Sequence, residues 1–134
     1  MRVVDGDTIV VDLAGREEKV RLIGIDTPET VDPRRPVECF GNQASGHLKE
    51  LLPTGTTVRL VRDAEQRDRY GRLLAYVYRL DDDLFINLDL MSNGYANLLT
   101  IAPNVAHTDE FRAAERSARA TGIGLWTACE SGGP

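Results

Sequence analysis

The chain has 134 residues, of which 42% are hydrophobic and 28% charged, and these ordinary globular values exclude a disordered or fibrous protein. This length predicts one domain that buries roughly two-thirds of its unfolded surface. The net charge of -5 argues against a protein that coats or stores nucleic acid by passive neutralisation of phosphates. Because the sequence has no apolar run of about 18 residues, no membrane span is predicted.

Strands are predicted at four segments rich in Val, Ile, Leu or Tyr: residues 2–13, 17–25, 56–62 and 70–79. Turn signals at Asp5-Gly6 and Ala14-Gly15 indicate successive antiparallel strands in the first half. In the two later segments, apolar residues occupy odd and even positions alike, with arginines between them. This pattern fits a small closed barrel better than an open sheet with one wet face.

Three helices are predicted, over residues 40–52, 86–93 and 108–120. Pro53 stops the first helix, whereas Gly94 and Gly122 end the other two as left-handed caps. Thr108 and Asp109 are the N-cap candidates of the third helix. Strands, one helix, two more strands and two helices follow one another, and this order is typical of an α+β protein.

Charged residues of two kinds gather in three short segments, VDGDT, VRLIGIDTPET and DRYGRLLAY. Carboxylates bind hard cations and guanidiniums bind phosphate, so a site with both favours metal-assisted phosphodiester chemistry. Pro28 disfavours a helix at Thr27 and ends the preceding strand, which places Asp26 and Glu29 on a rim loop. Asp5 is interpreted as a structural residue of its turn.

The three segments, at these separations, resemble the staphylococcal nuclease family from about residue 2 to Trp126. The resemblance implies an α+β fold, namely a five-stranded OB-fold β-barrel capped by about three α-helices. One domain is expected over residues 1–134, with a core of about residues 2–127 and a short flexible tail at 130–134. The implied activity is Ca²⁺-dependent hydrolysis of DNA and RNA that leaves 3′-phosphate ends. Little sequence specificity is expected, because the chain carries no sequence-reading helix motif.

The implied metal ligands are the carboxylates of Asp7 and Asp26 with the carbonyl oxygen of Thr27, an oxygen set that suits Ca²⁺. For each of these residues alone, a turn or cap role would be the ordinary interpretation. The three matched positions together favour the metal site.

Three residues are candidate catalytic groups. Glu29 is the general base that activates water, a role typically worth about 10² to 10⁴ in rate. Arg21 and Arg72, predicted on strands, are two-donor forks that stabilise the phosphorane-like transition state. An isolated strand arginine is more often a solvated residue, but Gly71 permits close backbone approach just before Arg72.

Four further residues are candidate substrate contacts. Arg69 and Tyr70 match positions that line the substrate groove of the family. Leu99 and Ile101 stand where similar nucleases have aromatic residues before the pair equivalent to Pro103-Asn104. Because base stacking is worth about 1 to 3 kcal/mol per base, nucleotide affinity is expected to be weaker here. Single strands are the preferred substrates, since they enter a groove more easily than closed duplexes.

The remaining residues with possible chemistry receive structural interpretations. Cys39 and Cys129 lack zinc-ligand spacing, so they form a disulfide or are two buried thiols. His47 and His107 are interpreted as surface or capping groups, and Trp126 as an anchor for the tail. The run Asp81-Asp82-Asp83 is interpreted as a solvated hairpin turn, because it lacks the ligand spacing of an EF-hand.

Two alternatives to the enzyme remain at this point. One is a noncatalytic OB-fold module that binds nucleic acid or protein, and the other is a structural domain held by a disulfide. The presence of the acidic and arginine positions favours the enzyme. A disulfide would imply an oxidising compartment, and secreted relatives carry cysteines at about these places, so a secreted or cell-surface monomer is expected. Met1 directly precedes a predicted strand, which is typical of an expressed fragment without its signal peptide.

Overall fold

The computed structural model describes residues 1–28 and 38–129 of the chain. Its helices are α1 (Gly41–Leu51), α2 (Ile86–Ser92), α3 (Thr108–Thr121) and α4 (Leu125–Ala128). Its strands are β1 (Arg2–Asp5), β2 (Thr8–Leu13), β3 (Arg16–Leu22), β4 (Ile25–Asp26), β5 (Val58–Val61), β6 (Leu73–Arg79), β7 (Leu84–Phe85) and β8 (Asn97–Leu98). The predicted α+β class is confirmed.

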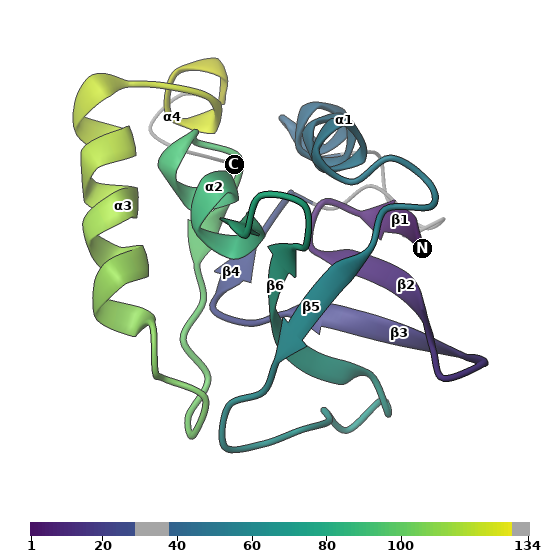
Figure 1. The fold of residues 1–134 in the computed structure, drawn as a ribbon. Helices are drawn as coiled ribbons and strands as arrows, with labels where there is room; N and C mark the ends of the chain where they lie inside the picture. The colour runs from purple at the N-terminus through teal and green to yellow at the C-terminus, as the bar shows by residue number, and fades with distance from the viewer. Residues whose placement is uncertain (29–37, 130–134) are drawn as a thin grey trace.

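The main sheet runs in the order β1-β2-β3-β6-β5, and β7 pairs with β6. All its pairs are antiparallel except β3 with β6, which is parallel. The sheet twists strongly, with α1 over one end and α2, α3 and α4 beside β4 (Figure 1). Within residues 1–28 and 38–129, no ladder joins β5 to β1, so hydrogen bonding does not close the five strands into a barrel. A separate two-stranded ladder pairs β4 with β8.

Helix positions follow from the apolar spacing and from the residues at the helix ends. Helix α1 buries Ala44 and Leu48 completely and ends shortly before Pro53, as predicted. Helix α3 ends at Gly122, whose φ of 66° is left-handed as expected for a C-cap. The predicted N-caps of α3 are wrong, because the cap residue is His107 and its side chain makes no capping bond.

Two predicted strands differ from the structure. The segment expected over residues 17–25 is interrupted after Leu22 by a turn at Gly24, and it resumes as the short strand β4. Gly24 has a φ of 85°, and a Cβ atom there would lie 2.4 Å from the ring of Phe111, so only glycine fits. The segment expected over 70–79 begins at Leu73, because the preceding residues form a turn.

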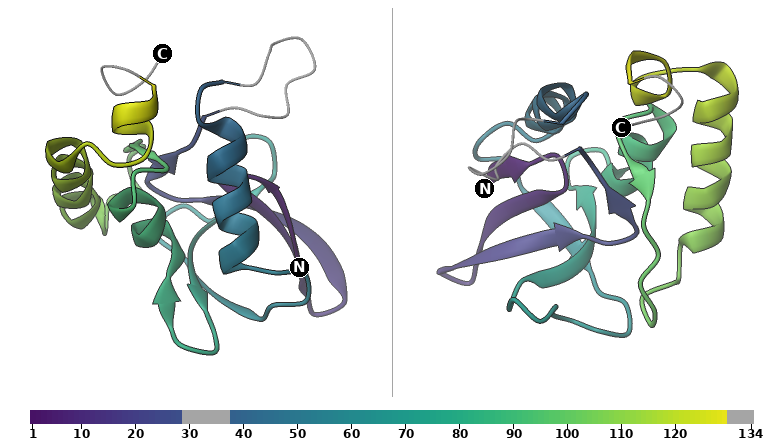
Figure 2. Two further views of the ribbon diagram at one scale, coloured as in Figure 1. Left: turned by 90° about the horizontal axis from the view of Figure 1, so that it is seen from above. Right: turned by 180° about the vertical axis from the view of Figure 1, so that it is seen from behind.

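A single apolar cluster lies between the sheet and the helices and includes Ile9, Val20, Leu22, Tyr76 and Phe111. Of the two alternatives for Cys39 and Cys129, the structure has the disulfide, with 5.7 Å between the Cα atoms. It joins the segment just before α1 to the residue after α4, and these two segments lie on the same side of the molecule (Figure 2). Among the described residues, no helix has both the length and the apolar character of a membrane span.

Candidate active site

Six of the predicted site residues line one open hollow of about 710 Å³. These residues are Asp7, Arg21, Asp26, Thr27, Tyr70 and Arg72. They come from the turn after β1, from β3 and β4, and from the turn before β6. We call this feature the polar hollow.

Asp7 is placed by the tight turn between β1 and β2. Its Oδ1 accepts a hydrogen bond from the Thr8 hydroxyl at 3.0 Å, and its Oδ2 accepts one from the Thr27 backbone nitrogen at 3.0 Å. Asp5 supports the same turn, because its Oδ1 accepts from the Gly6 nitrogen at 2.8 Å. A Cβ atom at Gly6 would lie 2.6 Å from Thr27 Oγ1, so glycine lets the turn pack against the Asp26-Thr27 segment.

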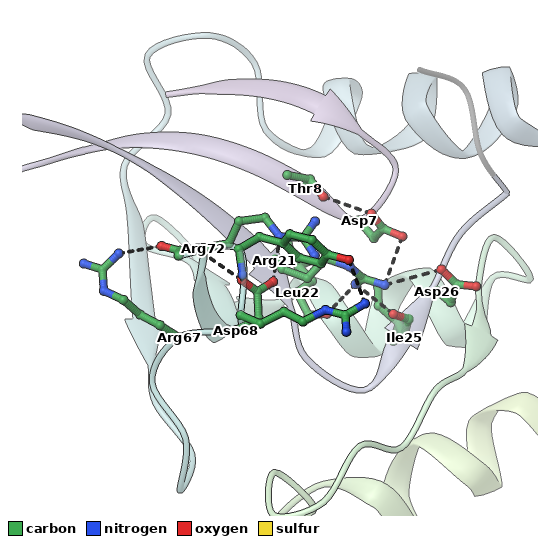
Figure 3. A network of polar contacts seen from close by, with 12 residues as sticks. Asp7, Thr8, Arg21, Leu22, Ile25, Asp26, Arg67, Asp68 and Arg72 are labelled. Atoms are coloured by element: carbon green, nitrogen blue, oxygen red, sulfur yellow. Dashed lines mark hydrogen bonds and ion pairs between the residues drawn. The ribbon is translucent and has the colours of Figure 1, made fainter. Parts of the chain in front are cut away.

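Arg21 lies between the two predicted metal-binding carboxylates (Figure 3). Its Nη2 is 3.3 Å from Asp7 Oδ2 and 3.3 Å from Asp26 Oδ1. Its Nη1 donates to the carbonyl oxygens of Leu22 and Ile25 at 2.8 and 2.9 Å, which fixes the guanidinium over the turn from β3 to β4. The prediction that Arg21 lies on a strand is confirmed.

Arg72 is presented by a turn rather than by a strand, which corrects the prediction. Asp68 organises this turn, since its Oδ1 accepts from the backbone nitrogens of Tyr70 and Arg72 and its Oδ2 accepts from Arg72 Nε at 2.7 Å. Burial raises the pKa of Asp68, but these hydrogen bonds outweigh it and hold the pKa below its ordinary value. In the described part of the chain, the terminal nitrogens of Arg72 have no such bond and suit a phosphate.

An apolar groove of about 450 Å³ adjoins the polar hollow and shares Arg21, Tyr70 and Arg72 with it. The four predicted substrate contacts Arg69, Tyr70, Leu99 and Ile101 all line this groove. The ring of Tyr70 lies 5.0 Å from the Arg69 guanidinium and 5.4 Å from that of Arg72. The structure therefore brings together these four residues, although they come from two separate segments.

Two residues that hold this region were missed by the sequence analysis. Asn104 joins two segments that line the apolar groove. Its Oδ1 accepts from the Glu65 nitrogen at 2.7 Å, and its Nδ2 donates to the Glu65 oxygen at 3.0 Å. Asp68 holds the Arg72 turn. An Asp four residues before an Arg in a turn was the available signal for Asp68, whereas Asn104 bonds to residues 39 positions away and carried none.

The two histidines were predicted to be surface or capping groups, and His107 does occupy the N-cap position of α3, while both rings also make contacts that were not predicted. His47 Nε2 lies 2.7 Å from Asp89 Oδ1, and its ring stacks on Tyr95 with 4.1 Å between centroids. His107 Nδ1 lies 2.8 Å from Glu110 Oε1, and its ring packs edge-on against Tyr76. Both rings join elements of the core and neither lines the polar hollow or the apolar groove.

The residue predicted as general base, Glu29, lies outside the described residues. Its position in the sequence is two residues after Thr27, which is described and buried.

The polar hollow fits a hard divalent cation by its chemistry. Within the described residues no three His, Cys, Asp or Glu side chains form a metal cluster, so Asp7 and Asp26 are a pair of carboxylates. Among the described residues, the buried hydroxyl Oγ1 of Thr27 has no hydrogen-bond partner, and a hard cation also accepts hydroxyl, carbonyl and water oxygens. The described lining carries four carboxylates against three cationic side chains, so a divalent cation would reverse its charge.

The family model described as staphylococcal nuclease homologue matches residues 19–128. A thermonuclease of Staphylococcus intermedius is 44% identical over 125 residues, which cover 93% of this chain and 73% of that protein. A thermonuclease of Staphylococcus hyicus is 41% identical over 127 residues, with 95% and 73% covered. The chain belongs to the staphylococcal nuclease family. Endonuclease YncB of Bacillus subtilis is 37% identical over 127 residues, with 94% and 59% covered.

Membership of the staphylococcal nuclease family establishes the class of activity. The domain of this family is an OB-fold, and the order of strands and helices agrees with it. Thermonuclease and endonuclease relatives identify a hydrolase that acts on phosphodiester bonds of nucleic acids. The nucleases of the family are metal-dependent. The noncatalytic module and the structural domain are therefore set aside.

Proposed function

We propose that this chain is a Ca²⁺-dependent nuclease that hydrolyses DNA and RNA with little sequence specificity and leaves 3′-phosphate ends. The observation that carries the proposal is the polar hollow, in which Arg21 lies 3.3 Å from both Asp7 and Asp26 while Arg72 faces the same space. Oxygen ligands for a hard cation and guanidinium donors for phosphate thus occur together.

Asp7, Asp26 and Thr27 would hold the Ca²⁺ ion. When bound, the ion supplies charge stabilisation at a phosphoryl oxygen and lowers the pKa of bound water. The Asp7 carboxylate is oriented for this role by its bonds to Thr8 and to the Thr27 nitrogen. Asp26 is the more exposed partner, with 56% of its side chain accessible, and so faces the solvent side of the hollow.

Arg21 and Arg72 would bind the non-bridging oxygens of the attacked phosphate. Both guanidiniums are fixed on one side, Arg21 by two backbone carbonyls and Arg72 by Asp68. Donors held in advance stabilise the negative charge that grows at phosphorus without reorganisation during the reaction. Glu29 would take the proton of the attacking water, a proposal that comes from its position in the IDTPET segment.

The apolar groove supports a preference for single strands without base reading. Leu99 and Ile101 are exposed apolar side chains, which contact base faces and do not distinguish base edges. The Cys39–Cys129 bridge supports an oxidising location, hence a secreted or cell-surface enzyme. We further propose that the chain acts as one domain and as a monomer.

The test is hydrolysis of denatured DNA with Ca²⁺ and with excess chelator, by the native chain and by Glu29→Gln and Arg72→Ala variants. We expect cleavage only with Ca²⁺, and a loss of at least about 10² in rate in both variants. Arg112→Ala is the matched control, because Arg112 is half-exposed on α3 and pairs only with Asp109 among the described residues. Phosphatase treatment of the products reports their 3′-phosphates. Equal rates with and without Ca²⁺ would contradict the proposal.

A further inference from the structure

We propose that Lys19 binds the phosphate next to the scissile one, on the side away from the apolar groove. The enzyme then holds a strand on both sides of the cut, as an endonuclease that cleaves internal bonds requires. This inference rests on the proposed function, in which Arg21 and Arg72 bind the scissile phosphate. It concerns a position on β3 for which the sequence analysis predicted no role.

Lys19 lies on the same face of β3 as Arg21. Val20 and Leu22 are buried in the core, so Lys19 and Arg21, which alternate with them, face outward. Residues two apart on a strand are separated by about 7 Å. This spacing is comparable to that of successive phosphates in an extended strand, and both side chains line the polar hollow.

The cationic side chains lie on either side of the proposed reaction centre. Arg21 and Arg72 line both the polar hollow and the apolar groove. Lys19 lines only the hollow, whereas Arg69 lines only the groove. The order is therefore Lys19, then the two central arginines, then Arg69, which matches three successive phosphates. An enzyme that removed only terminal nucleotides would need contacts on one side of the scissile bond.

Lys19 is available for such a contact. Its side chain is exposed, and among the described residues it makes no ion pair or side-chain hydrogen bond. Asp5 and Glu38 also line the hollow, and their charge opposes a phosphate until a divalent cation is present. In the described part of the chain, Arg21 and Arg72 form ion pairs with Asp7, Asp26 or Asp68, whereas Lys19 forms none with them.

The experiment uses single-stranded DNA tetranucleotides with three linkages. The central linkage is a phosphodiester, and either neighbour is replaced by an uncharged methylphosphonate, singly or together. The rate of central cleavage in Ca²⁺ gives kcat and KM for the native chain and for Lys19→Ala, Lys19→Arg and Arg69→Ala. The sequence contains only one other lysine, the exposed Lys49 of α1, and Lys49→Ala is the matched control.

We expect Lys19→Ala to lower kcat/KM about two- to fivefold on the fully charged strand, mainly through KM, as for one solvent-exposed charge contact. The loss disappears when the linkage that Lys19 contacts is the neutral one. It persists when only the linkage on the other side of the scissile bond is neutral. Arg69→Ala shows the opposite dependence on the two neighbours. Lys19→Arg keeps most of the affinity, and Lys49→Ala matches the native chain.

Equal losses in Lys19→Ala on all four strands, or no loss on any, would overturn the role of Lys19. Cleavage of the doubly neutral strand by the native chain tests the proposed function separately, since it needs no neighbouring phosphate. Fluorescence anisotropy with labelled strands and Glu29→Gln proteins repeats the Lys19 comparison without turnover. A native chain that binds but never cuts would then contradict the proposed function, while the anisotropy series still decides for or against Lys19.

Discussion

Arg67 forms a bidentate ion pair with Glu18, in which each terminal nitrogen lies 3.0 Å from one carboxylate oxygen. Its Nη1 also donates to the Gly71 carbonyl at 2.7 Å. Glu18 lies on β3 and Gly71 lies in the turn that presents Arg72, so the pair ties this turn to the strand that carries Arg21. Arg67 therefore serves as a positioning residue and not as part of a phosphate-binding cluster.

We expect Glu18→Gln and Arg67→Met each to lower kcat/KM by about two- to fivefold, because a misplaced Arg72 loses contact with the transition state. A positioning role predicts that kcat falls along with kcat/KM. Exchange of the two charges, by Glu18→Arg with Arg67→Glu, should not restore activity, because a carboxylate at position 67 cannot donate to the Gly71 carbonyl. Glu17 is next in the sequence and exposed, so Glu17→Gln is the control. If it lowers kcat/KM as much as Glu18→Gln does, the contact of Arg67 with Gly71 is not the cause.

The pair also predicts a dependence on pH. The hydrogen bond and charge of Arg67 lower the pKa of Glu18 despite some desolvation. A lowered carboxyl pKa contributes stability above the ordinary value of 4.5, and this contribution is lost as the pH falls through the folded-state pKa. The difference in Tm between the native chain and Glu18→Gln should therefore shrink below pH 4.5. A difference that grows on acidification would contradict the pairing.

Asp63 fastens the loop after Pro103 to the sheet. Its Oδ2 accepts from the Tyr76 hydroxyl and from the Ala106 nitrogen at 2.5 and 3.0 Å, and its Oδ1 accepts from the Ala64 nitrogen at 2.7 Å. Burial raises the pKa of Asp63, but these bonds outweigh it and lower the pKa below 3.8. Burial and the Asp63 charge raise the pKa of Tyr76.

We expect Asp63→Asn to reduce the free energy of unfolding by about 1 to 3 kcal/mol at pH 7, the cost of lost bonds to a charged acceptor. Because the depressed pKa stabilises only above its ordinary range, the deficit should narrow below pH 3.8. Urea unfolding at pH 7 and pH 3 measures both effects. Tyr76→Phe removes one of the three bonds and should reduce the free energy of unfolding by less than Asp63→Asn does. A larger reduction would assign the effect to the packing of Tyr76.

The Cys39–Cys129 bridge closes a loop of 90 residues. In the chain-entropy model, such a loop contributes roughly 4 to 5 kcal/mol by restricting the unfolded chain. Reduction should therefore lower the Tm clearly, and the Cys39→Ser, Cys129→Ser double variant should match the reduced native chain. The double variant should not respond to reductant. An unchanged Tm on reduction would show that other contacts already hold α4 in place.

The apolar groove lacks aromatic side chains at Leu99 and Ile101. Both side chains are exposed, at 37% and 63%, so a larger ring can be accommodated without repacking the core. Leu99→Tyr or Ile101→Tyr should lower KM for single strands severalfold, since base stacking is worth about 1 to 3 kcal/mol per base. Val105→Tyr, also exposed but outside the groove, is the control. Equal KM values in all three variants would show that bases do not reach the groove wall.

The sequence predicted the chemistry of the polar hollow better than the geometry of its parts. Asp7, Arg21 and Asp26 could be placed because turn residues and strand periodicity determine where they lie. Arg72 was placed on a strand because apolar residues follow it directly. In the structure, the Asp68 carboxylate accepts three hydrogen bonds from Tyr70 and Arg72 and holds the segment as a turn. Local capture of backbone donors by a carboxylate leaves no periodic signal.

The short elements were beyond prediction for a different reason. Strands β4 and β8 have two residues each, and their pairing of Ile25 with Leu98 joins segments more than 70 positions apart. Two residues carry no alternation, and their pairing depends on tertiary packing. The contacts of His47 with Asp89 and of His107 with Tyr76 could not be predicted for the same reason, because these partners are distant in the sequence.

The contact of Arg21 with Asp7 and Asp26 allows the chain to fold without its metal. Two carboxylates close together would repel each other in the folded chain, but the Arg21 guanidinium between them offsets part of this repulsion. The chain can therefore fold first and acquire its metal afterwards. Chelation should silence the nuclease but lower its Tm only slightly, because Arg21 holds the two carboxylates in place without the metal.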